Sequence, residues 1–177
     1  MMVLMAGLPG TGKTTLACEL ARRTGGRVLS KDKFRHAIFT ADEVEYCTRQ
    51  DDFVLQLILE TAGYLFTRGH ERVLFLDGRP FSRRYQIENV LTVAASLHQP
   101  WRILECVCSE QTVRHRLALD AQDRSHPAGN RDFELYRAVM DRFEAILHPK
   151  TMIDTDQPLA DAVASALRAL QIPLTNP

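Results

Sequence analysis

The feature that most constrains this chain is the stretch Gly7-Leu8-Pro9-Gly10-Thr11-Gly12-Lys13-Thr14. It fits the pattern G-x-x-x-x-G-K-[ST] at every fixed position. The apolar run Val3-Leu4-Met5-Ala6 precedes it, and a helix is predicted over residues 14–23 after it. A strand that leads through a glycine-rich turn into a helix directs backbone N–H groups and the positive end of the helix dipole to one point. The pattern therefore predicts a loop that binds the phosphates of a nucleotide.

The residue types within this loop suit that task. The glycines lack side chains that would block the approach of a phosphate group. Lys13 is long enough to reach the β- and γ-phosphates, and the hydroxyl of Thr14 is a candidate ligand for Mg²⁺. The candidate nucleotide-binding residues are Gly7, Pro9, Gly10, Thr11, Gly12, Lys13, Thr14 and Thr15.

Five short apolar segments alternate with helical patterns along the chain. The strands are predicted at residues 3–6, 27–30, 73–77, 101–107 and 151–154. This alternation predicts an α/β fold with a doubly wound, five-stranded parallel sheet. The length of 177 residues and the lack of a visible linker favour a single domain over residues 1–177.

Local signals set several boundaries. Thr40-Ala41-Asp42-Glu43 matches a capping box and is predicted to open a long helix that ends near residue 67. Ser82 is predicted to cap the helix that follows it, and a later helix is predicted to run to about Leu147. The polar residues 122–131, which include a proline and a glycine, are predicted to form a small lid.

Composition restricts the partners and the compartment. Lys plus Arg and Asp plus Glu number 22 each, so the net charge is zero, which does not favour a strongly nucleic-acid-binding surface. We see no signal peptide and no apolar run of membrane-spanning length. The four cysteines show no metal-ligand spacing and are expected to be reduced thiols, so we expect a cytoplasmic protein with no membrane partner.

A phosphate loop leaves several classes of nucleotide-binding protein open, and other motifs narrow them. GTPases need a guanine-reading N-K-x-D, which the sequence lacks in a suitable place. The L-S-G-G-Q type signature of transporter ATPases is absent, and helicases and ring ATPases are much longer. A short chain with a lid favours the small kinases.

Further segments carry a family resemblance. Four segments together resemble P-loop kinases, the AAA-type ATP-binding small kinases. They are the phosphate loop, Ser30-Lys31-Asp32-Lys33-Phe34-Arg35, Leu76-Asp77-Gly78 and Arg83-Arg84. The pattern is most similar to polynucleotide 5′-hydroxyl kinases, and gluconate kinase, chloramphenicol phosphotransferase and zeta-toxin kinases are also similar. The resemblance implies an ATP-using, Mg²⁺-dependent phosphotransferase with a hydroxyl acceptor. Where polynucleotide kinases have a polar Thr-Asn-type stretch after the aspartate, this chain has Gly78-Arg79-Pro80, so the acceptor stays open.

Asp32 and Arg35 are the candidate acceptor-side residues. They follow the second strand, at the sheet edge where α/β proteins bind ligands, and their i, i+3 spacing places them on one face of a helical turn. A carboxylate there can take the proton of an acceptor hydroxyl, and the arginine can hold the acceptor or a phosphate. The alternative is a structural ion pair at a helix start.

Three further residues complete the candidate site. Asp77 ends an apolar strand, where a carboxylate commonly holds Mg²⁺ in phosphate-loop enzymes, and the alternative is a turn aspartate before Gly78. Arg116 precedes the predicted lid and Arg124 lies within it, and both are candidates for neutralising charge during phosphoryl transfer. Similarity to related kinases also implies that Arg116 stacks on adenine. The alternative is a solvated, charged helix face.

These observations predict a cytoplasmic kinase that uses ATP and Mg²⁺ and phosphorylates a hydroxyl of a small-molecule acceptor. A polynucleotide 5′-hydroxyl kinase acting on single-stranded nucleic acid is the first alternative. A nucleotide-binding regulatory module with little turnover is the second.

Overall fold

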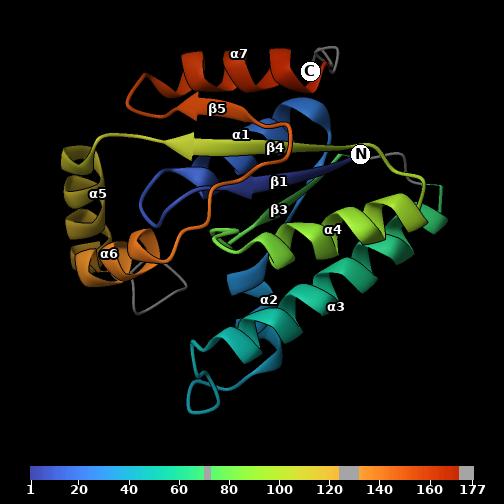
Figure 1. Cartoon of the computed structure of the whole chain (residues 1–177), viewed down its shortest axis with the longest axis horizontal. Coiled ribbons are helices and arrows are strands. Elements are labelled where there is room, and N and C mark those ends of the chain that lie inside the picture. The colour runs from blue at the N-terminus through green and yellow to red at the C-terminus, as the bar shows by residue number, and fades with distance from the viewer. Residues whose placement is uncertain (70–72, 124–131, 172–177) are drawn as a thin grey trace.

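A five-stranded, all-parallel β-sheet forms the centre of the structure (Figure 1). The computed structural model describes residues 1–69, 73–123 and 132–171. The spatial order of the strands is β2-β3-β1-β4-β5, which confirms the predicted doubly wound sheet. The strands are β1 (Met2–Ala6), β2 (Arg27–Ser30), β3 (Leu74–Asp77), β4 (Trp101–Val107) and β5 (Thr151–Asp154).

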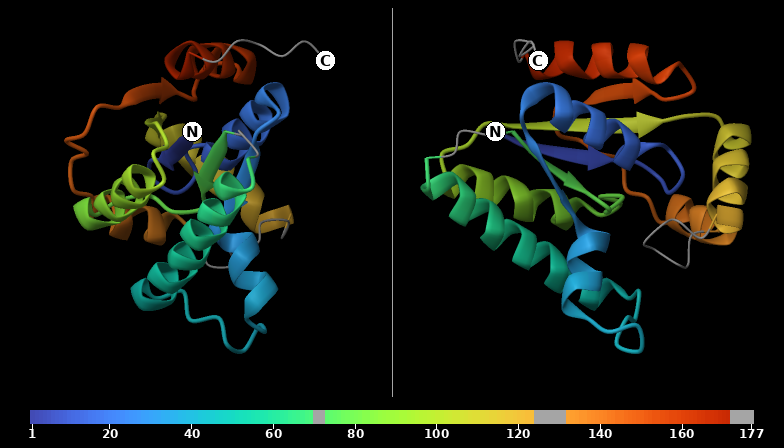
Figure 2. Two further views of the ribbon diagram at one scale, coloured as in Figure 1. Left: turned by 90° about the vertical axis from the view of Figure 1, so that its right-hand side faces the viewer. Right: turned by 180° about the vertical axis from the view of Figure 1, so that it is seen from behind.

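Helices cover both faces of the sheet (Figures 1 and 2). The side chains of β1 alternate between two core layers because successive strand residues point to opposite faces. Met2, Leu4 and Ala6 pack in the layer that contains α3 and α4. Val3 and Met5 pack in the layer that contains α1 and α7. The helices are α1 (Lys13–Thr24), α2 (Lys31–Ile38), α3 (Thr48–Thr67), α4 (Arg84–Ser96), α5 (Glu110–Asp123), α6 (Phe133–Asp141) and α7 (Leu159–Leu170).

The carboxyl ends of the strands meet at one edge of the sheet, where α5 and α6 stand (Figure 1). Val113 and Leu117 of α5 form a small cluster with Tyr136 of α6, and Leu8 of the phosphate loop packs against it. This is the edge at which open α/β sheets bind ligands. The fold thus brings the loops after all five strands toward one region.

Helix α3 begins later than its predicted capping box. The amide and hydroxyl of Thr40 both donate to the Glu43 carboxylate at 2.9 Å, so the capping contacts do form. The backbone then turns at Tyr46, which has a φ of 48°, and α3 starts where the thiol of Cys47 accepts from the amide of Gln50. The prediction of one helix from residue 40 to 67 is wrong, because the left-handed turn at Tyr46 separates the capped turn from α3.

The segment after α6 caps α4, and it corrects two predictions. The Glu144 carboxylate accepts from the amide of Arg84 at 2.7 Å and from the guanidinium of Arg83 at 3.0 Å. The amide of Glu144 donates to the carbonyl of Ser82 at 2.9 Å. Ser82 is therefore not the side-chain cap of α4. Helix α6 ends at Asp141 instead of near residue 147, because the residues after Asp141 supply the hydrogen-bond partners that the start of α4 needs.

Among the helices in the described ranges, none is both long enough and apolar enough for a bilayer crossing.

Candidate active site

The phosphate loop, residues 7–14, joins β1 to α1 in a fixed conformation. Gly7 has a φ of 126°, and a Cβ at this position would lie 2.4 Å from the carbonyl oxygen of Cys106 in β4. A side chain is therefore excluded both by backbone conformation and by space. The amide of Gly7 donates to the carbonyl of Pro80 at 3.1 Å. The loop is thus held by β4 on one side and by the segment after β3 on the other.

Lys13 is the first residue of α1, and its ammonium group lies against the loop. The Nζ atom donates to the carbonyl of Leu8 at 2.7 Å, and the hydroxyl of Thr11 donates to the same oxygen at 2.8 Å. Lys13 is 7% exposed. Its charge is therefore concentrated at the helix start, beside the backbone N–H groups of the loop.

Thr14 and Asp77 face each other where α1 begins and β3 ends. The Thr14 hydroxyl donates to Oδ2 of Asp77 at 2.9 Å. Oδ1 of Asp77 is buried and has no hydrogen-bond partner among the described residues. Mg²⁺ prefers hydroxyl and carboxylate oxygens and commonly uses one or two protein groups together with substrate phosphates. The unpartnered carboxylate oxygen beside a hydroxyl therefore fits a Mg²⁺ site.

Two cavities share Lys13 and Thr14, which line each of them. The first, here called the α1–α7 cavity, is also lined by Gly10, Gly12, Thr15, Arg116, Thr155 and the start of α7. The second, the α2–α3 cavity, has a volume of about 150 Å³ and is lined from α2, α3, the segment after β3, and α6. Pro9 lines the α2–α3 cavity.

Arg116 of α5 reaches the phosphate loop from the side of the α1–α7 cavity. Its guanidinium donates to the carbonyl of Thr155 at 2.7 Å, to the Thr155 hydroxyl at 3.3 Å and to the carbonyl of Gly10 at 3.5 Å. The Thr155 hydroxyl in turn donates to the carbonyl of Thr11 at 2.9 Å. Arg116 and Thr155 therefore tie the loop to the end of β5, and Thr155 is a residue that the sequence did not reveal.

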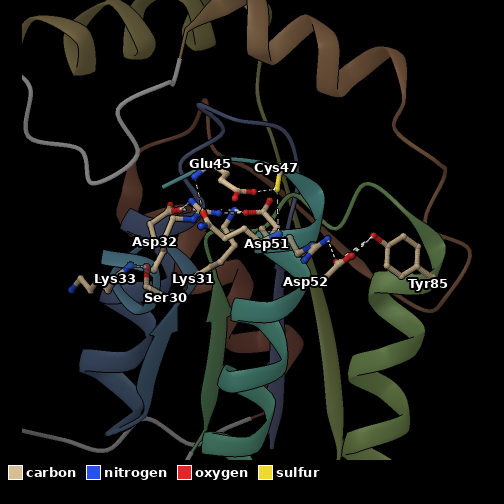
Figure 3. A network of polar contacts seen from close by, with 12 residues as sticks. Ser30, Lys31, Asp32, Lys33, Glu45, Cys47, Asp51, Asp52 and Tyr85 are labelled. Carbon is tan, nitrogen blue, oxygen red and sulfur yellow. Dashed lines mark hydrogen bonds and ion pairs between the residues drawn. The ribbon is translucent and has the colours of Figure 1, made fainter. Parts of the chain in front are cut away.

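A buried cluster of charges lies between α2 and α3 (Figure 3). Arg35 donates to Oδ1 of Asp32 at 3.2 Å and also to Oδ1 of Asp51. The ammonium of Lys31 donates to Oδ1 of Asp51 at 2.8 Å and lies 3.9 Å from Oδ1 of Asp32. Asp32 and Arg35 thus lie together on the wall of the α2–α3 cavity, and Asp51 and Lys31 are partners that sequence reasoning missed.

The Lys31 ammonium group is buried among these charges. Burial lowers the pKa of Lys31 to about 7, and the guanidinium groups of Arg35 and Arg79 lower it as well. The carboxylates of Asp32 and Asp77 act in the opposite direction. The charge of Lys31 therefore depends on what else occupies the cavity.

Arg79, in the segment after β3, lines the same cavity. Gly78 has a φ of 89°, and a Cβ there would lie 3.1 Å from the amide nitrogen of Lys31, so the segment approaches the start of α2 closely. One nitrogen of Arg79 donates to Asp52 at 2.5 Å, and the Tyr85 hydroxyl donates to the same carboxylate at 3.0 Å (Figure 3). An arginine just past a strand end at the ligand-binding edge was the available signal for Arg79 in the sequence.

Part of the predicted lid lies outside the described residues. This applies to Arg124 and to all of residues 124–131. The backbone of residues 122 and 123 belongs to the end of α5, and the lid over about residues 122–131 stays a prediction. The roles of Arg116 and Arg124 in phosphoryl transfer stay predictions.

A family model supports the relationship that the motifs suggested. The model of the AAA domain family matches residues 2–149, which include the phosphate loop, Asp32, Asp77 and Arg116. The match spans most of the chain, so the chain belongs to this family.

Solved structures share the fold over nearly the whole chain. A sugar kinase from Janibacter sp. HTCC2649 is similar with a TM-score of 0.69 and 18% identity, over 99% of this chain and 98% of that chain. APS kinase from Mycobacterium tuberculosis, in complex with AMPPNP and APS, has a TM-score of 0.71 and 16% identity, over 96% of each chain. A gluconokinase from Sinorhizobium meliloti 1021 has a TM-score of 0.64 and 15% identity, over 96% of this chain and 90% of that chain.

These likenesses confirm that the chain has the fold of the small P-loop kinases. A search of curated proteins gave no match.

Proposed function

We propose that this protein is an ATP- and Mg²⁺-dependent kinase that transfers the γ-phosphate to a hydroxyl group of a small-molecule acceptor. The observation that carries the proposal is that two cavities share Lys13 and Thr14. In-line phosphoryl transfer needs a donor and an acceptor on opposite sides of the transferred group. The α1–α7 cavity is suited to the nucleotide and the α2–α3 cavity to the acceptor.

The phosphate loop and the residues around it hold the nucleotide in this proposal. Backbone N–H groups and Lys13 bind the phosphates, and Arg116 supports the loop from the side of the α1–α7 cavity. Thr14 and Asp77 would hold Mg²⁺, which supplies positive charge against the charge that develops on the phosphate oxygens.

Asp32 is the proposed general base. The acceptor oxygen attacks the γ-phosphorus, the bond from that phosphorus to the β–γ bridging oxygen breaks, and ADP leaves. The hydroxyl proton passes to Asp32. We assign Oδ2 as the receiving atom, because Arg35 and Lys31 both lie at Oδ1.

The geometry of the α2–α3 cavity favours a small acceptor. Its volume of about 150 Å³ lies below the roughly 300–1,000 Å³ of pockets that hold drug-sized ligands, which favours a small acceptor. The zero net charge of the chain likewise gives no particular support to a nucleic-acid partner.

A screen of ADP release from Mg·ATP tests this function. The acceptor panel contains hydroxyl-bearing metabolites, hydroxyl-bearing antibiotics and 5′-hydroxyl oligonucleotides. We expect at least one small compound to stimulate ADP release and to gain one phosphate by mass. The Lys13→Ala variant should lose this activity. Lys33→Ala should retain it, because the Lys33 side chain is exposed and points away from the charged cluster (Figure 3).

Two outcomes of the screen would reassign the protein. Stimulation by oligonucleotides alone would make it a polynucleotide 5′-hydroxyl kinase. Nucleotide binding without stimulation by any acceptor would make it a regulatory module.

A further inference from the structure

We propose that the acceptor carries an anionic group, a phosphate or a carboxylate, and that Arg79 binds this group in the α2–α3 cavity. This inference rests on the proposed function, since it names the chemical class of the acceptor for the same site. It concerns a different part of the acceptor from the reacting hydroxyl.

Arg79 is a buried cation with unused hydrogen-bonding capacity. Its side chain is 3% exposed and lines the cavity. Its Nη2 atom contacts Asp52, whereas Nε and Nη1 are buried and have no hydrogen-bond partner among the described residues. Buried polar groups are nearly always hydrogen-bonded, so two unpartnered donors on one guanidinium group point to a ligand. Nη2 carries a second hydrogen besides the one that contacts Asp52. It can therefore form, with the free Nε or the free Nη1, the two-donor fork that binds two oxygens of a phosphate or carboxylate.

The charges around the cavity agree with an anionic ligand. Arg35 and Lys31 already engage the cavity carboxylates, Asp32 and Asp51. Asp52, the partner of Arg79, is 40% exposed, so solvent weakens its compensation of the buried guanidinium. The two carboxylates that line the cavity, Asp32 and Asp51, are therefore outnumbered by the cationic side chains that line it. The cationic residues that line the cavity are Lys13, Lys31, Arg35, Arg79, Arg83 and Arg142.

Lys31 lines the same cavity as Arg79. Burial and the neighbouring guanidinium groups lower the pKa of Lys31 to about 7. An anion bound by Arg79 would neutralise part of that positive field and favour the protonated form of Lys31. Lys31 is thus placed to add its charge when an anion enters.

The position of Arg79 also suits an acceptor that reaches the transferred phosphate. Arg79 immediately precedes Pro80, whose carbonyl accepts from the amide of Gly7 in the phosphate loop. Asp32 and Lys13 line the same cavity. An acceptor held by its anionic end at Arg79 can therefore present a hydroxyl to Asp32 and to the γ-phosphate side of the loop.

Anion binding can be measured without turnover. Orthophosphate and acetate are titrated by calorimetry into protein saturated with Mg²⁺ and a nonhydrolysable ATP analogue, which keeps both anions out of the phosphate loop. We expect one of the two to bind the parent, and the comparison of the two separates a phosphate site from a carboxylate site. Arg79→Gln should weaken that binding by about ten- to a hundredfold, as expected for losing hydrogen bonds to a charged group.

Two further variants make this measurement decisive. Arg22→Gln removes the same charge from an exposed position on α1 and should bind the anion like the parent. The double variant Asp52→Asn, Arg79→Gln replaces the ion pair by two neutral side chains. It guards against misfolding caused by an uncompensated Asp52, and it should bind as weakly as Arg79→Gln. Equal affinity in the parent and the Arg79 variants, or no binding of either anion by the parent, would overturn the inference.

The acceptor screen separates this inference from the proposed function. Each hydroxyl compound is offered with and without a phosphate or carboxylate group, and the anionic member should have the higher kcat/KM. If neutral compounds were equally good acceptors, the proposed anion site would be refuted and the proposed kinase activity would be retained. If anions bound at Arg79 but no acceptor stimulated ADP release, the proposed kinase activity would be refuted and the anion site would be retained.

Discussion

The hydroxyl of Thr14 donates to Oδ2 of Asp77 at 2.9 Å, although 63 positions separate the two residues. The parallel pairing of β1 with β3 brings them together, because Asp77 ends β3 and Thr14 lies in the first turn of α1, which follows β1 through the phosphate loop. The second oxygen of Asp77 is buried without a partner among the described residues. This pair is where the proposed Mg²⁺ site can be tested.

Asp77→Asn removes the negative charge from this pair while keeping its size. We expect the Mg²⁺ concentration needed for half-maximal stabilisation of the ATP-bound protein to rise by at least about tenfold. Thermal melting with ATP across a Mg²⁺ titration measures this. Asp42→Asn, an exposed change of the same kind, is the control. An unchanged Mg²⁺ requirement in Asp77→Asn would assign Asp77 to the turn alone.

Arg116→Ala tests the support of the phosphate loop. Arg116 contacts Thr155 and the carbonyl of Gly10, so its loss should loosen the loop and weaken ATP binding by about tenfold, the effect of losing one charge-assisted hydrogen bond. Calorimetric titration with ATP measures the affinity. Arg114→Ala on the same helix is the control, because Arg114 is exposed and pairs with Glu110. Equal ATP affinity in both variants would show that the contacts of Arg116 do not contribute to ATP binding.

Lys31→Met tests the burial of the Lys31 ammonium group. The pKa of Lys31 is about 7 in the folded protein, against an ordinary value of 10.5. At a pH between these two pKa values, the Lys31 ammonium is protonated in the unfolded chain but not in the folded chain. Lys31 therefore makes the free energy of unfolding rise as the pH increases from about 7 to about 10.5. Urea unfolding from pH 7 to 10 should show this rise in the parent relative to Lys31→Met. Parallel curves would contradict it.

Glu144→Ala tests the cap that the segment after α6 provides to α4. The amide of Arg84 and the guanidinium of Arg83 hold the pKa of Glu144 below its ordinary value. The ionised Glu144 therefore stabilises the fold above its unfolded pKa, and this contribution is lost as the pH falls through the lowered one. Melting temperatures should be lower for Glu144→Ala than for the control Glu88→Ala at pH 7, and the two should converge in acid. A gap that persists in acid would show that the cap acts through packing.

Each candidate site residue that could be predicted from the sequence is defined by a local sequence pattern. The loop glycines and Lys13 follow from consecutive residues, and Asp32 and Asp77 follow from their positions at predicted strand ends. Because parallel strands all end at one edge, these positions could be placed near each other before the structure was known.

The remaining features depend on contacts between distant segments. Glu144 caps a helix that begins 60 residues earlier, and Thr155 contacts a loop residue 144 positions away. The unused donors of Arg79 become visible only when its burial and its partner Asp52 are known. No local spacing encodes these relationships, and the same limit explains why the predicted extents of α3 and α6 were wrong.

Transfer of labelled γ-phosphate from ATP to an acceptor, compared between the parent and Asp32→Asn, tests the central claim most directly. Asn keeps the size of Asp32 but cannot take a proton, so transfer should fall by about 10²–10⁴-fold while ATP affinity stays nearly unchanged. Label must appear on the acceptor in the parent at the rate at which ADP is released. Label released only as inorganic phosphate, or transfer by Asp32→Asn within about threefold of the parent and so well short of that range, would contradict the account.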